Sequence, residues 1–207
     1  MKELNKLWQM RMQTTLNFLK QNKNIFITDV DSLWAKYKDL NKLPKQFDTF
    51  HGTGTKWPPN AFEEWGFVLC GCVQGYHSNS NTIKFFETLL DKCGNSCDDQ
   101  AILNRLFLEY GTEWENSPGL DDSVRIGYTK TNTGQMTSMV FSEKEVKRGK
   151  NLAEYLTDCQ SENPADKAWI MSPNIPKTMK KKLQMYDSLR ECLDNSTRGL
   201  VDEFLYF

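Results

Sequence analysis

IFITDVDSLW, residues 25–34, is the most informative stretch of this chain. It begins with a short apolar run that predicts a buried strand, and it places two carboxylates, Asp29 and Asp31, at the carboxyl end of that strand. Ligands of open α/β sheets bind at this end of the strands. Two carboxylates one residue apart repel each other unless a cation or a proton lies between them, and such hard oxygen ligands suit Mg²⁺ or Mn²⁺ shared with a substrate phosphate. The alternative is a strand that ends in a polar turn, with an aspartate capping the next segment.

A second acidic cluster, Asp98-Asp99-Gln100, lies much further along the chain. Either Asp98 or Asp99 is expected to open a helix there, because apolar residues recur at helical spacing over residues 102–110. Two such clusters in one chain favour a functional site over an ordinary polar turn.

The composition is that of a globular protein. The 207 residues are enough to bury a sizeable core in one domain. Hydrophobic residues make up 39%, charged residues 26% and aromatic residues 12%, which excludes a disordered chain. The net charge of −1 provides no basic surface, so no nucleic-acid partner is expected. The lysine-rich segment 177–182 is interpreted as the solvated face of a terminal helix, with contact to a substrate phosphate as the alternative.

Hydropathy and cysteine spacing set further bounds. No apolar stretch is long enough to cross a membrane, and the amino end is too polar for a signal peptide. Cys93 and Cys97 are spaced to close a small disulfide loop, and Cys70 and Cys72 share one face of a predicted strand. Neither pair has His or Cys partners at zinc-site spacing.

The periodicity predicts an α/β fold with mixed strands. Residues 3–21 are expected to form a helix that leads into the strand at 25–28, which is half of a parallel α/β unit. The strand that should precede this helix is missing, so a fragment or an incomplete gene model is expected. The other predicted elements are strands at 47–50, 67–73 and 168–171, a helix opened by Asn79 or Ser80, a hairpin of 124–128 and 136–141, and a closing helix at 175–193.

The segment 52–65 is rich in Gly, Thr, Pro and Trp and is expected to be a loop. Such a loop either packs over the core or forms a lid over a site. The sequence is compatible with a packed loop and with a lid.

One enzymatic hypothesis is a phosphohydrolase of the haloacid dehalogenase type. Asp29 would then attack phosphorus, Asp31 would act as acid and base, and Asp98-Asp99 would be the later metal site. Two features disfavour it. Leu33 stands where that family usually has Thr or Val, and the later acidic pair follows segment 91–97, which cannot be a buried strand.

A second hypothesis follows from three segments taken together: IFITDVDSLW, WGFVLCGC at 65–72, and CDDQAILN at 97–104. Their order and approximate spacing resemble the nucleotide-diphospho-sugar transferase family of plants and algae, over roughly residues 7–145. The resemblance implies a GT-A-like mixed sheet flanked by helices, lacking the first nucleotide-binding strand. It also implies one partial catalytic domain over 1–207, with the end of the nucleotide-binding part at 1–34 and the donor and acceptor part at 44–193.

The resemblance further implies the roles of individual residues. Asp31, and Asp29 directly or through the ribose, would hold Mn²⁺ or Mg²⁺ on the diphosphate of the donor, because the leaving nucleoside diphosphate gains negative charge. Asp99 and Gln100 would be the catalytic contacts to hydroxyl groups of the donor sugar.

Three more residues are expected to bind the donor. Gly71 would lie beside it, where a small residue lets the backbone approach closely. Asp98 would either cap the helix or support the residues that contact the donor directly. Arg11 would reach the diphosphate, with an exposed helix arginine as the alternative.

The implied reaction is the transfer of a sugar from a nucleotide sugar, expected to be a UDP-sugar, to a glycan or glycoprotein acceptor. Golgi-lumenal location is implied, with any membrane anchor outside this chain. Many GT-A enzymes use a late histidine as a third metal ligand, whereas this chain has only His51 and His77, and offers Asn174 in its late turn. His51 is expected to be an ordinary loop residue. The alternative function is an inactive or partial transferase domain that binds a sugar or a partner protein.

Overall fold

The computed structural model of the chain describes residues 2–29, 32–34, 38–94, 97–116, 124–148, 168 and 170–171. Several features singled out from the sequence lie outside these residues: Asp31, Asn174, the lysine-rich segment 177–182 and the closing helix predicted at 175–193. The chain divides into two compact units. The first contains residues 1–27 and 44–141, and the second contains residues 28–43 and 142–207.

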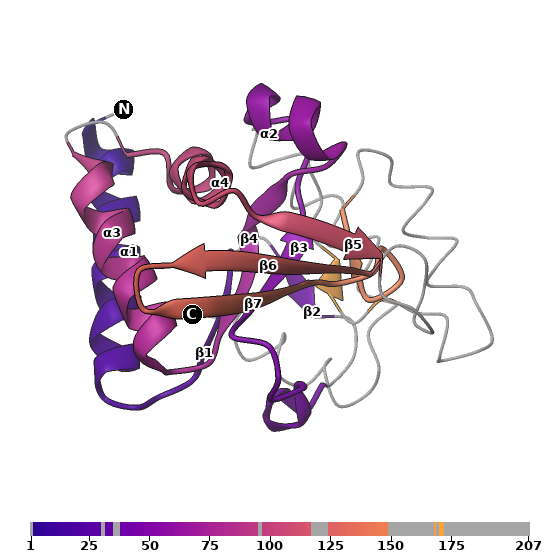
Figure 1. Ribbon diagram of the computed structural model, residues 1–207. Helices are drawn as coiled ribbons and strands as arrows, with labels where there is room; N and C mark the ends of the chain where they lie inside the picture. The colour runs from indigo at the N-terminus through magenta and orange to yellow at the C-terminus, as the bar shows by residue number, and fades with distance from the viewer. Residues whose placement is uncertain are drawn as a thin grey trace, which may run out of the picture. The chain divides into compact units, whose positions relative to one another are not determined.

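A six-stranded mixed sheet with helices packed against it forms the first unit (Figure 1). The strands follow the order β1-β4-β3-β7-β6-β5. β3 runs parallel to β7, whereas the pairs β3–β4, β5–β6 and β6–β7 are antiparallel. The predicted mixed α/β fold is therefore confirmed. The strands of this sheet are β1 (Ile25–Thr28), β3 (Thr49–Thr53), β4 (Leu69–Tyr76), β5 (Glu113–Asn116), β6 (Arg125–Thr131) and β7 (Gly134–Val140).

Four α-helices are described, all in the first unit. They are α1 (Lys2–Lys20), α2 (Pro59–Trp65), α3 (Ser80–Cys93) and α4 (Asp99–Glu109). Helix α1 packs against α3 and α4, α3 also packs against α4 and β7, and α4 packs against β4. Helices α1 and α3 lie side by side in Figure 1.

Helix α1 confirms the helix predicted at 3–21. Met12, Leu16 and Leu19 recur at helical spacing and are buried on the face that meets the rest of the unit. The helix ends where Asn22 adopts a left-handed φ of 58°, a conformation that asparagine tolerates better than most residues. The chain then enters β1 at Ile25, as predicted.

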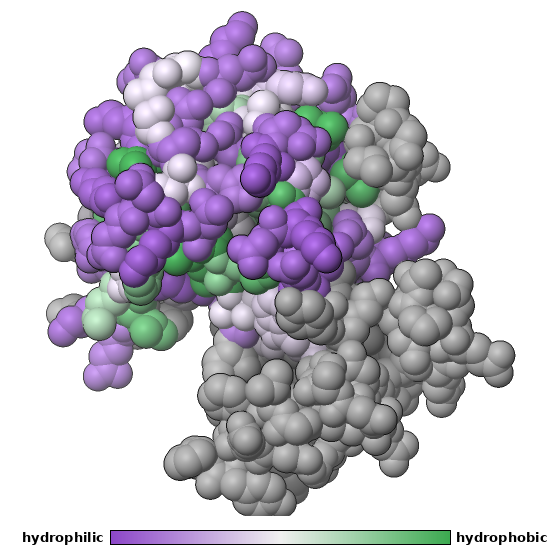
Figure 2. Space-filling view, turned by 90° about the horizontal axis from the view of Figure 1, so that it is seen from below, coloured by the Kyte–Doolittle hydropathy of each residue, from purple (hydrophilic) through white to green (hydrophobic). Residues whose placement is uncertain are grey.

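The core of the first unit lies between the sheet and helices α1, α3 and α4. Helix α3 contributes Phe85, Phe86 and Leu89, and α4 contributes Leu103 and Phe107. Beside this core, Trp114 of β5 packs edge-on against Trp65 and Phe67. On the face shown in Figure 2, most of the coloured residues are hydrophilic, with hydrophobic residues in small groups among them. Apolar side chains are thus concentrated in the interior.

Strand β4 differs from the prediction at both ends. It begins at Leu69 rather than at residue 67, and it continues through Gly75 to Tyr76. The end predicted at residue 73 is therefore wrong, and Gly75 does not terminate the strand. A Cβ atom at this position would lie 2.9 Å from a ring carbon of Phe26, so Gly75 marks a close approach of a side chain rather than a turn.

The segment expected to be a loop at 52–65 contains helix α2, which the sequence interpretation missed. Pro59 occupies the first helical turn, where its missing N–H leaves no bond unmade. Gly66 ends the helix in the left-handed conformation, with a φ of 76°. The two prolines therefore mark the start of a helix here.

The hairpin predicted around residues 131–134 is confirmed. Strands β6 and β7 pair in continuous antiparallel register from Arg125↔Val140 to Thr131↔Gly134. Strand β5, which was not predicted, pairs with β6 at the edge of the sheet.

The second unit contains a small three-stranded sheet with the order β2-β9-β8. Its strands are β2 (Leu33–Trp34), β8 (Val146–Lys147) and β9 (Ile170–Met171), of which only β9 was predicted. A short 3₁₀ helix at Leu40–Lys42 is capped by the side chain of Asp39. The Trp34 indole donates a hydrogen bond to the Thr28 hydroxyl at 3.4 Å, which links β2 to the end of β1.

Two disulfide bonds occur among the described residues. One joins Cys93 to Cys97 and closes the short loop between α3 and α4, which confirms the spacing argument. The other joins Cys70 to Cys72 on β4. Among the described helices, none is both long and apolar enough to span a bilayer.

Candidate functional site

Strand β4 bulges where it passes under the start of α4. His51 of β3 pairs with Gln74, and Thr53 pairs with Leu69, so the single residue Gly52 lies opposite the four residues 70–73. Bulges of this kind redirect backbone groups and side chains and are common beside functional sites. Side chains from α1 and α4 form hydrogen bonds with the backbone of the bulged segment.

Helix α4 begins at the acidic cluster. Asp98 is its N-cap, and Asp98 Oδ1 accepts a hydrogen bond from the Ala101 amide at 2.9 Å. Of the two residues expected to open the helix, Asp98 is therefore the cap. Asp99 is the first helical residue, and its side chain is directed elsewhere.

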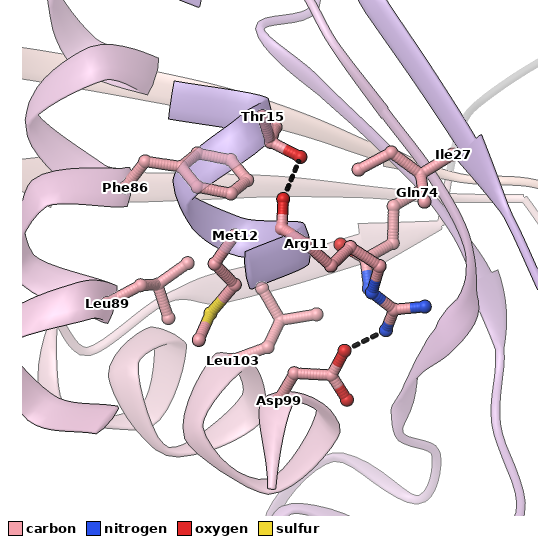
Figure 3. Close-up of a pocket in the computed structure, with 9 residues that line it drawn as sticks. All are labelled: Arg11, Met12, Thr15, Ile27, Gln74, Phe86, Leu89, Asp99 and Leu103. Carbon is pink, nitrogen blue, oxygen red and sulfur yellow. Dashed lines mark hydrogen bonds and ion pairs between the residues drawn. The ribbon is translucent and has the colours of Figure 1, made fainter. Parts of the chain in front are cut away.

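Asp99 forms an ion pair with Arg11 of α1 (Figure 3). The guanidinium Nη2 of Arg11 contacts Asp99 Oδ2 and also donates to the carbonyl of Gly71 at 3.2 Å. The side chains are only 24% exposed for Arg11 and 9% exposed for Asp99, so water screens the pair less than it would on an open surface. Among the described residues, Asp99 Oδ1 has no hydrogen-bond partner. The arrangement therefore fixes one carboxylate oxygen and leaves the other able to accept a bond.

Gln100 bridges β4 to the segment before α2. Its Oε1 accepts from the Gly71 amide at 3.0 Å, and its Nε2 donates to the Trp57 carbonyl at 2.5 Å. A Cβ atom on Gly71 would lie 3.2 Å from Gln100 Cβ and 3.4 Å from Asp99 Oδ1. Glycine at this position lets the two α4 side chains approach the strand backbone.

One turn further along α4, Asn104 anchors the helix to the same strand. This fully buried side chain accepts from the Leu69 amide at 2.8 Å and donates to the Leu69 carbonyl at 2.9 Å. It also donates to the Gln100 carbonyl at 2.8 Å. The spacing D-D-Q-x-x-x-N thus has a physical basis, because residues four apart lie on the same face of a helix.

A small cavity adjoins the ion pair. Its polar lining comes from Arg11, Thr15, Gln74 and Asp99, and the remaining lining is apolar (Figure 3). Its volume of about 10 Å³ is room for about one water molecule. Gln74 donates to the Gly71 carbonyl at 3.0 Å and accepts from the Tyr76 hydroxyl. Burial raises the pKa of Tyr76, so this phenol stays protonated and keeps its hydrogen bond to Gln74.

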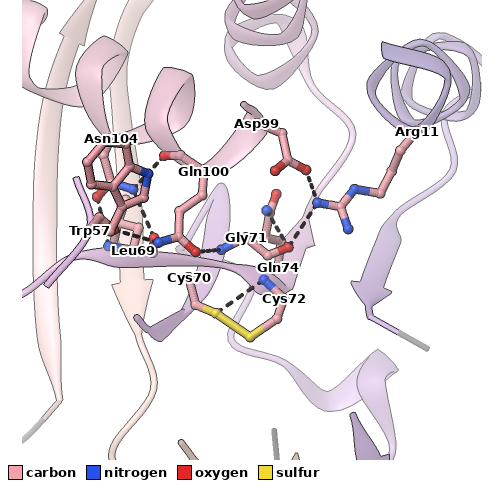
Figure 4. Close-up of a disulfide and its surroundings, with 10 residues drawn as sticks. All are labelled: Arg11, Trp57, Leu69, Cys70, Gly71, Cys72, Gln74, Asp99, Gln100 and Asn104. Carbon is pink, nitrogen blue, oxygen red and sulfur yellow. Dashed lines mark hydrogen bonds and ion pairs between the residues drawn. A yellow bond between two sulfur atoms is a disulfide. The ribbon is translucent and has the colours of Figure 1, made fainter. Parts of the chain in front are cut away.

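The Cys70–Cys72 disulfide lies on the opposite side of β4 from Asp99 and Gln100 (Figure 4). Both cysteines are buried, and the Cys72 amide approaches Cys70 Sγ at 3.2 Å. The bridge spans Gly71, whose N–H and C=O are the groups bound by Gln100 and Arg11. The bulge is therefore constrained covalently on one side and by hydrogen bonds on the other.

Asp29 follows β1 and belongs to the second unit. It is half-buried, and its carbonyl accepts from the Ser32 amide at 2.9 Å. Its carboxylate is a hard oxygen ligand, so the donor chemistry suits Mg²⁺ or Mn²⁺. Within the described residues, which exclude Asp31, no group of three or more His, Cys, Asp or Glu side chains is placed to hold a metal.

His51 is not the loop residue that the sequence suggested. It lies in β3, fully buried, with its ring edge-on to Tyr76 and Phe107. Burial lowers the pKa of His51 to about 3, because the interior disfavours the charged imidazolium. Its Nε2 lies 3.0 Å from Thr49 Oγ1, and Thr49 in turn donates to Ser138. His51 is a neutral core residue.

The structure brings together Arg11, Gly71, Asp98, Asp99 and Gln100, all singled out from the sequence. It adds Trp57, Gln74 and Asn104, which sequence reasoning did not assign. Asn104 belonged to the quoted motif, and Trp57 belonged to the loop interpreted as a lid or a packed segment. Gln74 had no recognisable signal.

Comparison with known proteins gave one result. The sequence model of a family described as nucleotide-diphospho-sugar transferase matches residues 1–185. No curated protein matched the chain, and no solved structure matched it.

Proposed function

We propose that this chain, which belongs to the nucleotide-diphospho-sugar transferase family, transfers a sugar from a nucleoside-diphosphate sugar to a glycan or glycoprotein acceptor in a metal-dependent reaction. The observation that carries the proposal is the start of α4. There Arg11 holds one oxygen of Asp99, and the other has no hydrogen-bond partner among the described residues, while the adjacent Gln100 is bound to the Gly71 backbone. A fixed carboxylate with one open oxygen suits the recognition of a sugar hydroxyl.

Asp99 and Gln100 are proposed as the residues that contact the donor sugar while the glycosidic bond breaks. Arg11 is proposed to assist donor binding by orienting the carboxylate of Asp99, with which it forms an ion pair. Gly71 lies against both residues, so the sugar can approach the strand backbone. Asp98 supports the donor by fixing the first turn of α4.

Asp29 and Asp31 are proposed to hold Mn²⁺ or Mg²⁺. The ion supplies positive charge against the diphosphate that leaves with the nucleoside, which is expected to be uridine. Support comes from the two carboxylates that follow β1 and from the preference of these cations for carboxylate oxygen.

The Golgi lumen is the proposed location. The two disulfides among the described residues support an oxidising compartment, because disulfides persist there and are rare in the cytosol.

The proposal is tested by incubating the full chain with a panel of UDP-sugars and MnCl₂ and measuring UDP release. We expect slow hydrolysis of one donor that stops when the metal is chelated and in Asp31→Asn. Asp91→Asn, which changes an exposed carboxylate of α3, is the matched control and should keep the parent rate. Absence of hydrolysis together with retained UDP-sugar binding would favour the inactive binding module. Cleavage of an aryl phosphate through an aspartyl-phosphate would favour the phosphatase.

A further inference from the structure

Trp57 is an exposed aromatic residue that precedes α2 and is hydrogen-bonded to the start of α4. Its side chain is 54% exposed, although tryptophan is highly buried on average. The other exposed large hydrophobic residues in the described part of the chain are Leu7, Met10 and Phe18, all on α1. Trp57 is therefore the member of this group that adjoins the candidate site.

The orientation of Trp57 is fixed at two points. Its indole N–H donates to Asp98 Oδ2 at 3.2 Å, and its carbonyl accepts from Gln100 Nε2 at 2.5 Å. Both partners belong to the start of α4, so ring and backbone are held by the same turn. A side chain held in this way loses little conformational entropy when a ligand covers it.

The indole of Trp57 is not part of an aromatic cluster in the described part of the chain. Within the described residues, no other aromatic ring or cation packs against Trp57. By contrast, Trp65 packs against Trp114 and Phe67, and the adjacent Lys56 lies over Phe62 at 4.9 Å. Trp57 thus combines exposure with a hydrogen-bonded N–H edge and a ring that no described aromatic or cationic group covers.

We propose that Trp57 is the platform on which one sugar ring of the acceptor glycan stacks. A sugar ring presents C–H groups on its faces and hydroxyls at its rim, so one face packs on an apolar aromatic surface while the rim stays hydrated. The Gln100 side chain spans from Gly71 to Trp57, with Arg11 and Asp99 on the other side of it (Figure 4). The inference rests on the proposed function: if Asp99 contacts the donor sugar, Trp57, which bonds to both residues that flank Asp99, adjoins that contact.

The test is binding of the full chain to an array of plant and animal oligosaccharides, followed by titration with the glycans that bind. Trp57→Ala should weaken binding roughly tenfold to a hundredfold, the range typical of losing a stacked ring. Trp57→Phe keeps an aromatic face and should retain most of the affinity. Phe18→Ala, which removes an exposed aromatic side chain from α1, is the matched control and should bind as the parent does. Circular dichroism of each variant verifies folding.

Two results would overturn the inference: no glycan bound by the parent, or glycans bound equally by the parent and a folded Trp57→Ala. A third would be loss of UDP affinity in Trp57→Ala by calorimetry, since that would place the residue on the donor. A failure of the proposed function would give a different result from a failure of this inference. If the parent hydrolyses no nucleotide sugar but binds glycans through Trp57, the transferase proposal is lost and the stacking platform stands.

Discussion

Helices α3 and α4 begin with similar sequence signals and use them differently. Helix α3 is capped by Asn79, whose Oδ1 accepts from the Thr82 amide at 3.0 Å, while the Asn79 amide donates back to the Thr82 hydroxyl at 3.1 Å. This reciprocal capping box satisfies the turn from within. In α4 the cap is equally good, but the next two side chains extend away from the helix, Asp99 to Arg11 of α1 and Gln100 to Gly71 of β4.

The difference gives a physical reason to propose a functional role for one helix start and a structural role for the other. Both helix N-termini carry the same partial positive charge from aligned peptide dipoles, so that charge does not distinguish them. What differs is where the polar side chains go. In α4, Gln100 binds the backbone of the bulged strand, and Asp99 binds Arg11 through one oxygen while its other oxygen has no partner among the described residues. In α3, Asn79 and Thr82 bond to each other and to Asp48 and the His77 carbonyl.

The largest expected effect comes from Asp99→Asn. The amide keeps the size of the side chain but loses the charge that Arg11 holds, so turnover should fall by about 10²–10³-fold, as for loss of a preorganised transition-state contact. UDP affinity should change little, because the contact is to the sugar. Steady-state kinetics and calorimetry on the full chain measure the two quantities.

A folded Asp99→Asn variant with parental turnover would mean that the two helix starts do not differ in function. Arg11→Lys sharpens the result, because lysine keeps the charge but its side chain is shorter and does not place a donor where Arg11 Nη2 contacts both Asp99 and the Gly71 carbonyl. It should show an intermediate loss of turnover.

Gly71→Ala should disturb the start of α4 selectively. The added methyl would meet Gln100 Cβ and Asp99 Oδ1, and overpacking of this kind typically costs about 1–3 kcal/mol. Turnover per folded molecule should fall as well, because the two side chains are displaced. Gly75→Ala is the matched control on the same strand: it crowds Phe26 and Phe50 instead, so it should lower the melting temperature without a selective loss of turnover. Equal effects of both on turnover would contradict the assignment.

The parts of the fold that depend on local signals were predictable. The apolar spacing of α1, the cap of α3 and the turn of the β6–β7 hairpin are each contained in a few neighbouring residues. Helix α2 was missed because Pro58 and Pro59 were taken as loop residues, although proline suits the first turn of a helix.

The candidate site was predictable only in its residue types. The motifs indicated the acidic start of α4 and a small residue at Gly71, whereas the role of Gly71 beside the donor stays a prediction. The contacts did not, because Arg11 reaches Gly71 and Asp99 across 60 and 88 positions of the chain. The bulge in β4 is a property of its pairing with β3, and no local pattern in the strand indicates it. Gln74 becomes part of the site only through that bulge.

Acid should weaken the packing beneath α4 through His51. Its pKa is about 3 in the folded chain against 6.5 in the unfolded chain, so the unfolded state binds more protons below pH 6.5. The free energy of unfolding is unaffected by this group above pH 6.5 and decreases as the pH falls below that value. At pH 5 the decrease from His51 alone is about 2 kcal/mol. Denaturant unfolding at several pH values measures it.

The control for that experiment is His51→Gln, which should unfold with a shallower dependence on pH between 5 and 7. Hydrogen exchange locates the effect. Because the His51 ring packs on Phe107 of α4, amides of α4 should lose protection before those of α3 as the pH falls. Simultaneous loss in both helices would show that acid does not separate them.

The smallest expected effects compare the two caps directly. Asn79→Ala and Asp98→Ala should each lower the free energy of unfolding by about 1 kcal/mol, the usual loss for a helix cap. Beyond that their consequences should diverge. Asn79 bonds to Thr82 and to Asp48, so its loss should leave turnover and acceptor KM unchanged. Asp98 also accepts from the Trp57 indole, so its loss should free the ring and raise the acceptor KM by a few-fold. If both variants lose the same stability and neither changes KM, Asp98 is a cap in the same sense as Asn79, and the functional part of α4 begins at Asp99.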